Sequence, residues 1–167
     1  QRIVERARRG KARVASLEAR ERRLAPPQLF DLTDLQRTAN RLFGFSAQKT
    51  LDLAQALYEQ KKILSYPRTD SRHLSVSVAK TLPRIVKVIA GGYAGLLAPG
   101  TGERALGERF VNDAKVSDHH AIIPTATSPS GVSLSDDERK IYDLVCRRLL
   151  GAWHADHRYS VTTVITE

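Results

Sequence analysis

Hydrophobic residues recur at helical spacing through the middle of the chain, which predicts a mainly helical domain. Asp31 or Thr33 can cap a first helix that runs to about Phe43. Gly44 can end this helix, because glycine adopts the left-handed conformation found after many helix C-termini. The apolar stripe of the predicted helix consists of Leu35, Ala39 and Leu42.

Two further helical regions follow along the chain. Ser46 can cap a helix that runs to about Lys62, where positive side chains suit a helix C-terminus. Residues 76–90 contain Pro83, which predicts one turn of helix, a fresh start at the proline and a stop at Gly91-Gly92. The inward residues that we predict for the helix after Ser46 are Leu53, Ala54 and Leu57.

The clearest helix signal comes late in the chain, after a long stretch rich in Gly, Pro, Ser and Thr at residues 98–134. A loop of that length inside a compact domain is usually functional or disordered. Ser135 and Glu138 then have the spacing of a capping box. The apolar residues that follow at helical spacing are Ile141, Leu144, Val145 and Leu149.

The two ends of the chain have strand-like patterns. Residues 159–166 are rich in β-branched side chains, and residues 12–19 alternate weakly. We expect these two segments to pair, and Pro26-Pro27 marks a boundary after the first. The predicted fold class is therefore mainly α with a small β portion. The predicted divisions are an N-terminal hinge at residues 1–28, a helical domain at residues 29–157 and a C-terminal hinge strand at residues 158–167.

The charge balance narrows the choice of partner. The chain has 27 Lys and Arg against 18 Asp and Glu, a net charge of +9. Such an excess favours nucleic acid, although acidic membrane lipid would also fit it. No apolar run reaches the ~20 residues that span a bilayer. The single cysteine, Cys146, excludes an internal disulfide framework and a Cys-rich zinc site. We expect a cytoplasmic protein with no membrane partner.

The N-terminal segment contributes much of the positive charge. Two interpretations remain open for it, a solvated face or a nucleic-acid contact. Because the first residue is Gln1 and not Met, we also expect a piece of a longer protein. The basic residues of this segment are Arg2, Arg6, Arg8, Arg9, Lys11, Arg13, Arg20, Arg22 and Arg23.

The segment from Tyr66 to Arg72 gathers the most reactive chemistry. Pro67 biases Tyr66 toward an extended conformation, in which Tyr66 and Arg68 would project to the same side. A phenol is a weak nucleophile at neutral pH unless a cation stabilises its phenolate. An arginine can supply that cation and also hold a phosphate oxygen through two N–H groups. The pair therefore suits attack on a phosphodiester.

A plainer interpretation exists for the same residues. Tyr66 could be a half-buried turn residue and Arg68 a surface charge, and for an isolated Tyr-Pro-Arg tripeptide this is the better interpretation. The neighbouring residues weaken it, because a packed turn would not need a wholly polar cluster. These neighbours are Thr69, Asp70, Ser71 and Arg72.

The adjacent histidines His119 and His120 form a second polar cluster, within the long loop. A histidine beside a phosphate can donate a hydrogen bond or, when protonated, supply charge. From spacing alone, a structural or merely exposed histidine is the better interpretation. We predict no metal site in the chain, because adjacent histidines rarely converge on one ion and the segment His154–His157 lacks a third ligand. No Walker A loop, dinucleotide fingerprint or aspartate cluster for Mg²⁺ is present in the sequence.

Three blocks of the sequence resemble the type IA DNA topoisomerases, and within that family the bacterial topoisomerase III group. The blocks occur in the family's order and at nearly its spacing, across roughly residues 10–167. They are residues 26–59 with interruptions, the run Ile63–Leu74 and the run His119–Thr125. Three ordered blocks are far more specific than any one motif.

The resemblance implies roles for individual residues. Tyr66 is similar to the tyrosine that attacks one DNA strand and forms a 5′-phosphotyrosine bond. Arg68 is similar to the arginine that positions the scissile phosphate, and His119 to the histidine that contacts it. Pro67 is typical of topoisomerase III-like members. The residues that we expect to contact DNA nearby are Thr69, Asp70, Ser71, Arg72, Lys115 and His120.

The resemblance also implies what the chain lacks. The family's Toprim domain, which carries the Mg²⁺ ligands, and most of its DNA-binding arch have no counterpart in these 167 residues. We therefore expect the chain to bind no metal ion of its own and not to relax supercoiled DNA by itself. The expected partners are single-stranded DNA and the missing Toprim and arch domains of the same longer protein. The alternatives are a non-catalytic single-stranded DNA-binding module and, less fittingly, a tyrosine recombinase, which needs further basic residues grouped differently.

Overall fold

The computed structural model describes residues 2–167, without the side chains of Ile3, Arg6 and Ala7. Gln1 and the side chain of Arg6, which belongs to the basic N-terminal segment, therefore lie outside the described part. The chain divides into two compact units. One consists of Pro26–His154, and the other joins Gln1–Ala25 to Ala155–Glu167.

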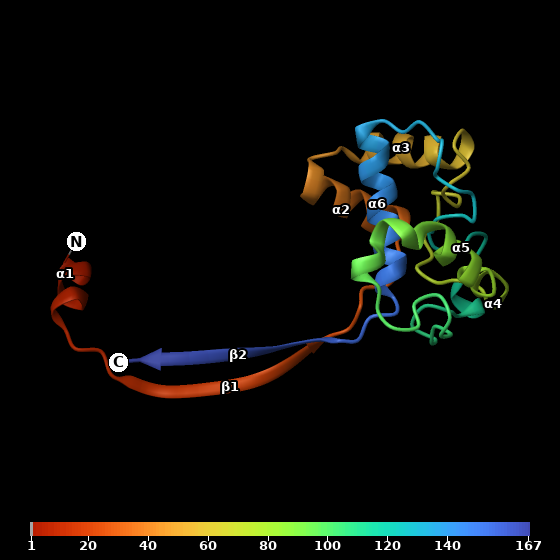
Figure 1. Ribbon diagram of the computed structural model, residues 1–167. Helices are drawn as coiled ribbons and strands as arrows, with labels where there is room; N and C mark the ends of the chain where they lie inside the picture. The colour runs from red at the N-terminus through yellow and green to blue at the C-terminus, as the bar shows by residue number, and fades with distance from the viewer. Residues whose placement is uncertain (1) are drawn as a thin grey trace. The chain divides into compact units, whose positions relative to one another are not determined.

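The larger unit is helical (Figure 1). It contains the hydrophobic core. Helix α3 packs against both α2 and α6, and the loops that follow α3 complete the core. The mainly helical character predicted from the sequence is confirmed. The elements of this unit are α2 (Leu32–Phe43), α3 (Ala47–Glu59), α4 (Val76–Ala79), α5 (Leu82–Ile89), the 3-10 helices η1 (Ala90–Leu96) and η2 (Asp113–Lys115), and α6 (Asp136–Gly151).

Local capping signals set the helix ends, as the sequence predicts. Asp31, not Thr33, caps α2, and its carboxylate accepts the Asp34 N–H at 2.6 Å. Gly44 follows α2 in the left-handed conformation, at φ 70°. Ser135 and Glu138 form the predicted capping box of α6, in which each side chain accepts the other residue's backbone N–H. These signals succeed because each depends on only four consecutive residues.

Replacing Ser135 with alanine tests the capping box. The hydroxyl satisfies a backbone N–H that has no partner inside the helix, so its loss should lower the free energy of unfolding by about 1 kcal/mol. Denaturant unfolding of the 167-residue chain measures this loss. Ser133→Ala is the matched control, because Ser133 is exposed in the preceding loop and should tolerate the change. Equal losses in both variants would contradict the capping role.

Some helical details differ from the prediction. Leu42 is 54% exposed, whereas Leu35 and Ala39 of the same predicted stripe are fully buried. Leu53 is only half-buried on α3. That helix ends at Glu59 and not near Lys62, which adopts the left-handed conformation at φ 59°. The helical backbone does not end at Gly91-Gly92, because both glycines lie within η1, which directly follows α5.

The long stretch at residues 98–134 is irregular apart from η2, as predicted, and is fixed at several points to the rest of the unit. Isolated antiparallel bridges join Phe30 to Ile122 and Leu64 to Pro124. A parallel bridge joins Leu74 to Val111. These bridges bring the loop that carries His119 beside the loop that carries Tyr66, although the two are about fifty residues apart in the sequence.

The smaller unit contains α1 (Arg2–Arg9), β1 (Val14–Leu24) and β2 (His157–Thr166). The two strands form an antiparallel ribbon in which Leu24 pairs with His157 and Val14 with Thr166 (Figure 1). The predicted pairing of the chain ends is confirmed, but β1 extends to Leu24 where the sequence indicated a stop near residue 19. Helix α1 was not predicted. Both strands are exposed throughout their length within the described residues.

No helix within residues 2–167 has both the length and the apolar composition that crossing a membrane requires.

Candidate functional site

The loop that carries Tyr66 is fastened to the loop that carries His119 by hydrogen bonds around Ser65. The Ser65 N–H donates to the Ile123 carbonyl at 2.9 Å, and the Ser65 hydroxyl accepts the Ile123 N–H at 2.9 Å. The same hydroxyl donates to the Ala121 carbonyl at 3.4 Å. Tyr66 and His119 therefore come from two segments that the backbone holds side by side.

The ring of Tyr66 contacts two other rings. Its centroid is 4.3 Å from that of His119, at an interplanar angle of 43°. Tyr58 of α3 contacts it in an edge-to-face arrangement, with centroids 5.4 Å apart. Tyr66 is half-buried, so part of it remains accessible at the surface. The geometry fixes a phenol beside an imidazole.

Arg68 lies on the exposed side of the same loop. The Thr69 N–H donates to the Pro67 carbonyl at 3.1 Å, which makes a three-residue turn centred on Arg68. The straight extended segment expected at Tyr66 and Arg68 is therefore wrong in this detail, because the backbone bends there. The Arg68 guanidinium donates one hydrogen bond, to Gln55 Oε1 at 3.2 Å. The orientation of the Arg68 side chain is therefore set by this contact with α3, and not by the alternation of side chains along a strand.

A polar pocket of about 420 Å³ opens next to these residues. Arg68 and His119 supply its basic groups, and Asp70 and Asp118 its carboxylates. The first turn of α2 also lines it, and the N-terminus of a helix favours an anion because of its free N–H groups and dipole. The full lining is Leu32, Thr33, Arg68, Thr69, Asp70, Ser117, Asp118 and His119.

Thr69 and Ser71 are buried and serve the packing of the loops. The Thr69 hydroxyl donates to the His119 carbonyl at 2.9 Å and accepts the Ser71 N–H at 3.1 Å. The Ser71 hydroxyl donates to the Lys115 carbonyl at 2.8 Å. The two side chains are only 8% and 5% exposed. The argument that a packed turn would not need these polar residues is therefore wrong, since the turn uses both hydroxyls to hold the His119 loop.

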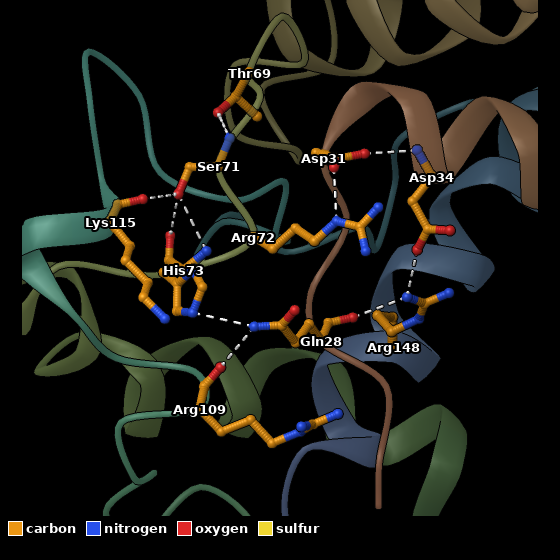
Figure 2. A network of polar contacts seen from close by, with 10 residues as sticks. All are labelled: Gln28, Asp31, Asp34, Thr69, Ser71, Arg72, His73, Arg109, Lys115 and Arg148. Carbon is orange, nitrogen blue, oxygen red and sulfur yellow. Dashed lines mark hydrogen bonds and ion pairs between the residues drawn. The ribbon is translucent and has the colours of Figure 1, made fainter.

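Arg72 does not line the polar pocket, which we call the tyrosine pocket because Tyr66 packs against its lining residue His119. Its Nε donates to Asp31 at 2.7 Å, the carboxylate that also caps α2 (Figure 2). This hydrogen bond is the main reason that the pKa of Arg72 is raised above its ordinary value. Arg72 thus ties the loop after Tyr66 to the start of α2.

Lys115 and His120, also expected at the site, lie outside the pocket lining. Lys115 is exposed, and its charge adds to burial in lowering the pKa of the neighbouring His73. His120 is half-buried, with Nδ1 2.7 Å from the Ala121 carbonyl oxygen. Burial lowers the pKa of His120 below its ordinary value, because a charged ring would lose hydration there.

Of the residues predicted from the sequence, the pocket brings together Arg68, Thr69, Asp70 and His119, with Tyr66 against His119. Sequence reasoning missed Ser117 and Asp118. Their position directly before the histidine pair was the available signal, and Ser117 donates to Asp70 at 3.2 Å. Within residues 2–167, no three His, Cys, Asp or Glu side chains lie together in a way that could hold a metal ion.

Comparison with known proteins shows the class of this chain. All of residues 1–167 match the family model described as DNA topoisomerase. The chain therefore belongs to the DNA topoisomerase family, as a type IA member.

Individual relatives sharpen this assignment. The chain is 42% identical to DNA topoisomerase 3 of Bacillus cereus over 167 residues, which is 99% of this chain and 23% of the relative. It is 46% identical to DNA topoisomerase 3 of Bacillus subtilis over 156 residues, 92% of this chain and 22% of the relative. The chain thus spans less than a quarter of the length of these relatives.

A solved structure shares the fold. The full-length topoisomerase I from Thermotoga maritima matches with a TM-score of 0.66 over 99% of this chain and 27% of that structure's chain. The identity is 24%, so this likeness concerns the fold. A fold similar to that of this chain therefore occurs within a larger topoisomerase.

Proposed function

We propose that Tyr66 is the nucleophile of an ATP-independent type IA topoisomerase, and that this chain is the tyrosine-bearing part of it. The observation that carries the proposal is the contact of the Tyr66 and His119 rings at 4.3 Å, beside a polar pocket that His119 shares with Arg68. A nucleophile, a fixed cation and a hydrogen-bonding imidazole are the groups that phosphodiester attack requires.

In the proposed reaction the Tyr66 oxygen attacks the phosphorus of a single DNA strand. The phenol gives up its proton, a bond forms between its oxygen and phosphorus, and the bond from phosphorus to the 3′-oxygen breaks. The 3′-oxygen takes up a proton and leaves as a hydroxyl. Because one phosphoester bond replaces another, the energy of the broken bond is kept in the bond to Tyr66 and no ATP is needed. Resealing after strand passage is the reverse of these steps.

Arg68 and His119 bind the phosphate in this scheme. The Arg68 guanidinium donates to the non-bridging oxygens, whose charge grows as phosphorus gains a fifth bond. His119 donates a further hydrogen bond from the opposite loop. The buried hydroxyls of Thr69 and Ser71 position these groups, whereas the exposed Asp70 and Lys115 remain candidates for direct DNA contact. We assign no direct role to His120.

We propose that other domains of the longer protein supply the metal site and the DNA-binding arch. The Mg²⁺ ligands are proposed to lie in a Toprim domain of the longer protein. The paired ends, residues 1–28 and 158–167, are proposed as the hinge to an arch domain, which lets the helical part carry the severed strand aside. Since the matched relatives are bacterial, we place the activity in the cytoplasm, on nucleoid DNA.

Covalent capture of labelled single-stranded DNA tests the proposal. The chain is mixed with the Toprim portion of the longer protein, Mg²⁺ and an oligonucleotide, and the products are separated under denaturing conditions. An adduct that depends on Tyr66 supports the topoisomerase assignment. Tight binding with no adduct would instead support the alternative, a non-catalytic single-stranded DNA-binding module.

Replacing Arg68 with alanine should separate cleavage from binding. Because Arg68 is assigned to the transition-state charge, cleavage by the reconstituted enzyme should fall about 10²–10³-fold. DNA affinity should fall less than about threefold, since one phosphate contact among several is lost. Adduct yield and fluorescence anisotropy measure the two quantities on the same samples.

The control for this variant is Arg84→Ala, which removes an exposed arginine from α5. It should leave both cleavage and affinity near their original values. If Arg68→Ala lowers cleavage and affinity by the same factor, Arg68 merely binds the DNA backbone and its assigned role is wrong.

A further inference from the structure

A second, larger pocket of about 500 Å³ lies in the helical unit and shares no lining residue with the tyrosine pocket. Five of its lining residues are arginines, two from α2, one from α6 and one from each of two irregular stretches of chain. These are Arg37, Arg41, Arg72, Arg109 and Arg148, and we refer to them together as the arginine pocket.

Two of the arginines are held in place by carboxylates. Arg148 Nη1 donates to Asp34 and to the Gln28 carbonyl, both at 2.8 Å, and its guanidinium lies 3.6 Å from the Phe30 ring centre. Arg72 is held by Asp31 through Nε alone (Figure 2). Each guanidinium has five N–H donors, so both keep further donors for a ligand. Because they are already ordered, binding costs them little rotamer entropy.

The other three arginines have no carboxylate partner among the described residues, and Arg109 donates from Nε to the Pro26 carbonyl at 3.1 Å. Arg37 and Arg41 are exposed and stand four residues apart, on one face of α2. Neither forms an ion pair with a carboxylate in the part of the chain that the structure describes. Two like charges at this spacing weaken a helix slightly, so helix stability does not account for them. Even with Asp31 and Asp34 counted, the pocket keeps three positive charges in excess.

We propose that the arginine pocket is a second phosphate-binding site, which holds the backbone of a nucleic-acid strand outside the tyrosine pocket. Guanidinium forks match the oxygens of a phosphate, and polar, cationic walls suit a phosphodiester better than an apolar ligand. The two pockets are neighbours along the same elements. Arg68 and Arg72 flank one short loop, and α2 lines the tyrosine pocket with its first turn and the arginine pocket with later turns.

That the bound strand is DNA rests on the proposed function, whereas the phosphate site itself does not. A strand bound in both pockets would have phosphates contacted in each of them, with the first part of α2 between the two sites. The arginine pocket then contributes affinity and register, and Tyr66 contributes the chemistry.

The test measures binding of the 167-residue chain to a fluorescent single-stranded oligonucleotide at several salt concentrations. The double variant Arg37→Ala/Arg41→Ala should bind at least about tenfold more weakly, with a salt slope smaller by about 1 to 1.5, as expected for two lost phosphate contacts. The matched control is Arg84→Ala/Lys87→Ala, which removes the same charge from exposed positions on α5 and should cost less than about threefold.

Competition identifies the ligand. Unlabelled oligonucleotide should displace the probe at far lower phosphate concentration than inorganic phosphate or polyglutamate does. Equal losses in the two double variants, no binding by the unchanged chain, or displacement by polyglutamate as effective as by DNA would each overturn the proposal. Adduct formation at Tyr66 is measured separately, so failure here is distinguishable from failure of the proposed function.

Discussion

Replacing Tyr66 with phenylalanine is expected to reduce covalent DNA capture by the reconstituted enzyme at least about a thousandfold, to below detection. The variant removes one oxygen, the atom that bonds to phosphorus. The ring that packs against Tyr58 and His119 is retained, so the loop should keep its structure. Denaturing gels of labelled single-stranded DNA measure the adduct, and anisotropy should show binding within about twofold of the original.

Tyr58→Phe is the matched control, because the same atom is removed from the neighbouring ring. Tyr58 lies on α3, and its ring supports Tyr66 by an edge contact that phenylalanine preserves. Adduct formation should therefore persist. Adducts that survive in Tyr66→Phe but disappear in Tyr58→Phe would mean that the nucleophile has been assigned to the wrong tyrosine.

The largest stability effect is expected from Leu35→Ala, which should lower the free energy of unfolding by about 2–5 kcal/mol. Leu35 is fully buried between α2 and the rest of the core. Truncation loses its transfer free energy and leaves a cavity that the surrounding side chains fill only in part. Since small domains are stable by only about 5–15 kcal/mol, this is a large fraction of the total. Urea unfolding followed by circular dichroism measures it.

Leu42→Ala makes the same substitution seven residues further along the same helix. Because Leu42 is 54% exposed, this substitution should change the free energy of unfolding of the protein by less than about 0.5 kcal/mol. The pair isolates burial from composition and helix propensity. A loss of several kcal/mol at Leu42 would show that this side chain is covered in solution, against the arrangement described above.

The sequence predicts features whose causes are local. The caps at Asp31, Ser135 and Gly44 depend on a few neighbouring residues, so their positions follow from the sequence directly. Leu42 was misplaced because spacing along a helix gives a direction but not what packs there. On α2 the core covers Leu35 and Ala39, whereas Leu42 in the last turn points away from it and is exposed.

The candidate site divides in the same way. Tyr66, Arg68 and His119 were found through sequence blocks, but their arrangement depends on contacts that span the chain. The Thr69 hydroxyl reaches a carbonyl fifty residues away, and Arg148 meets an aspartate 114 residues earlier. The arginine pocket was invisible for this reason, because its members share no sequence motif and meet only in the folded unit.

The hydrogen bonds that join the two loops also bear on how a severed strand would be held for resealing in the proposed reaction. Ser65 and Thr69 fasten the segment of Tyr66 to the backbone at His119 and Ile123. If the helical unit moves, Tyr66, Arg68 and His119 therefore move with it as one group. In the proposed reaction, a 5′ phosphate bound to Tyr66 would therefore keep its orientation relative to Arg68 and His119 while the severed strand is held aside, and resealing would depend on bringing back the 3′ end.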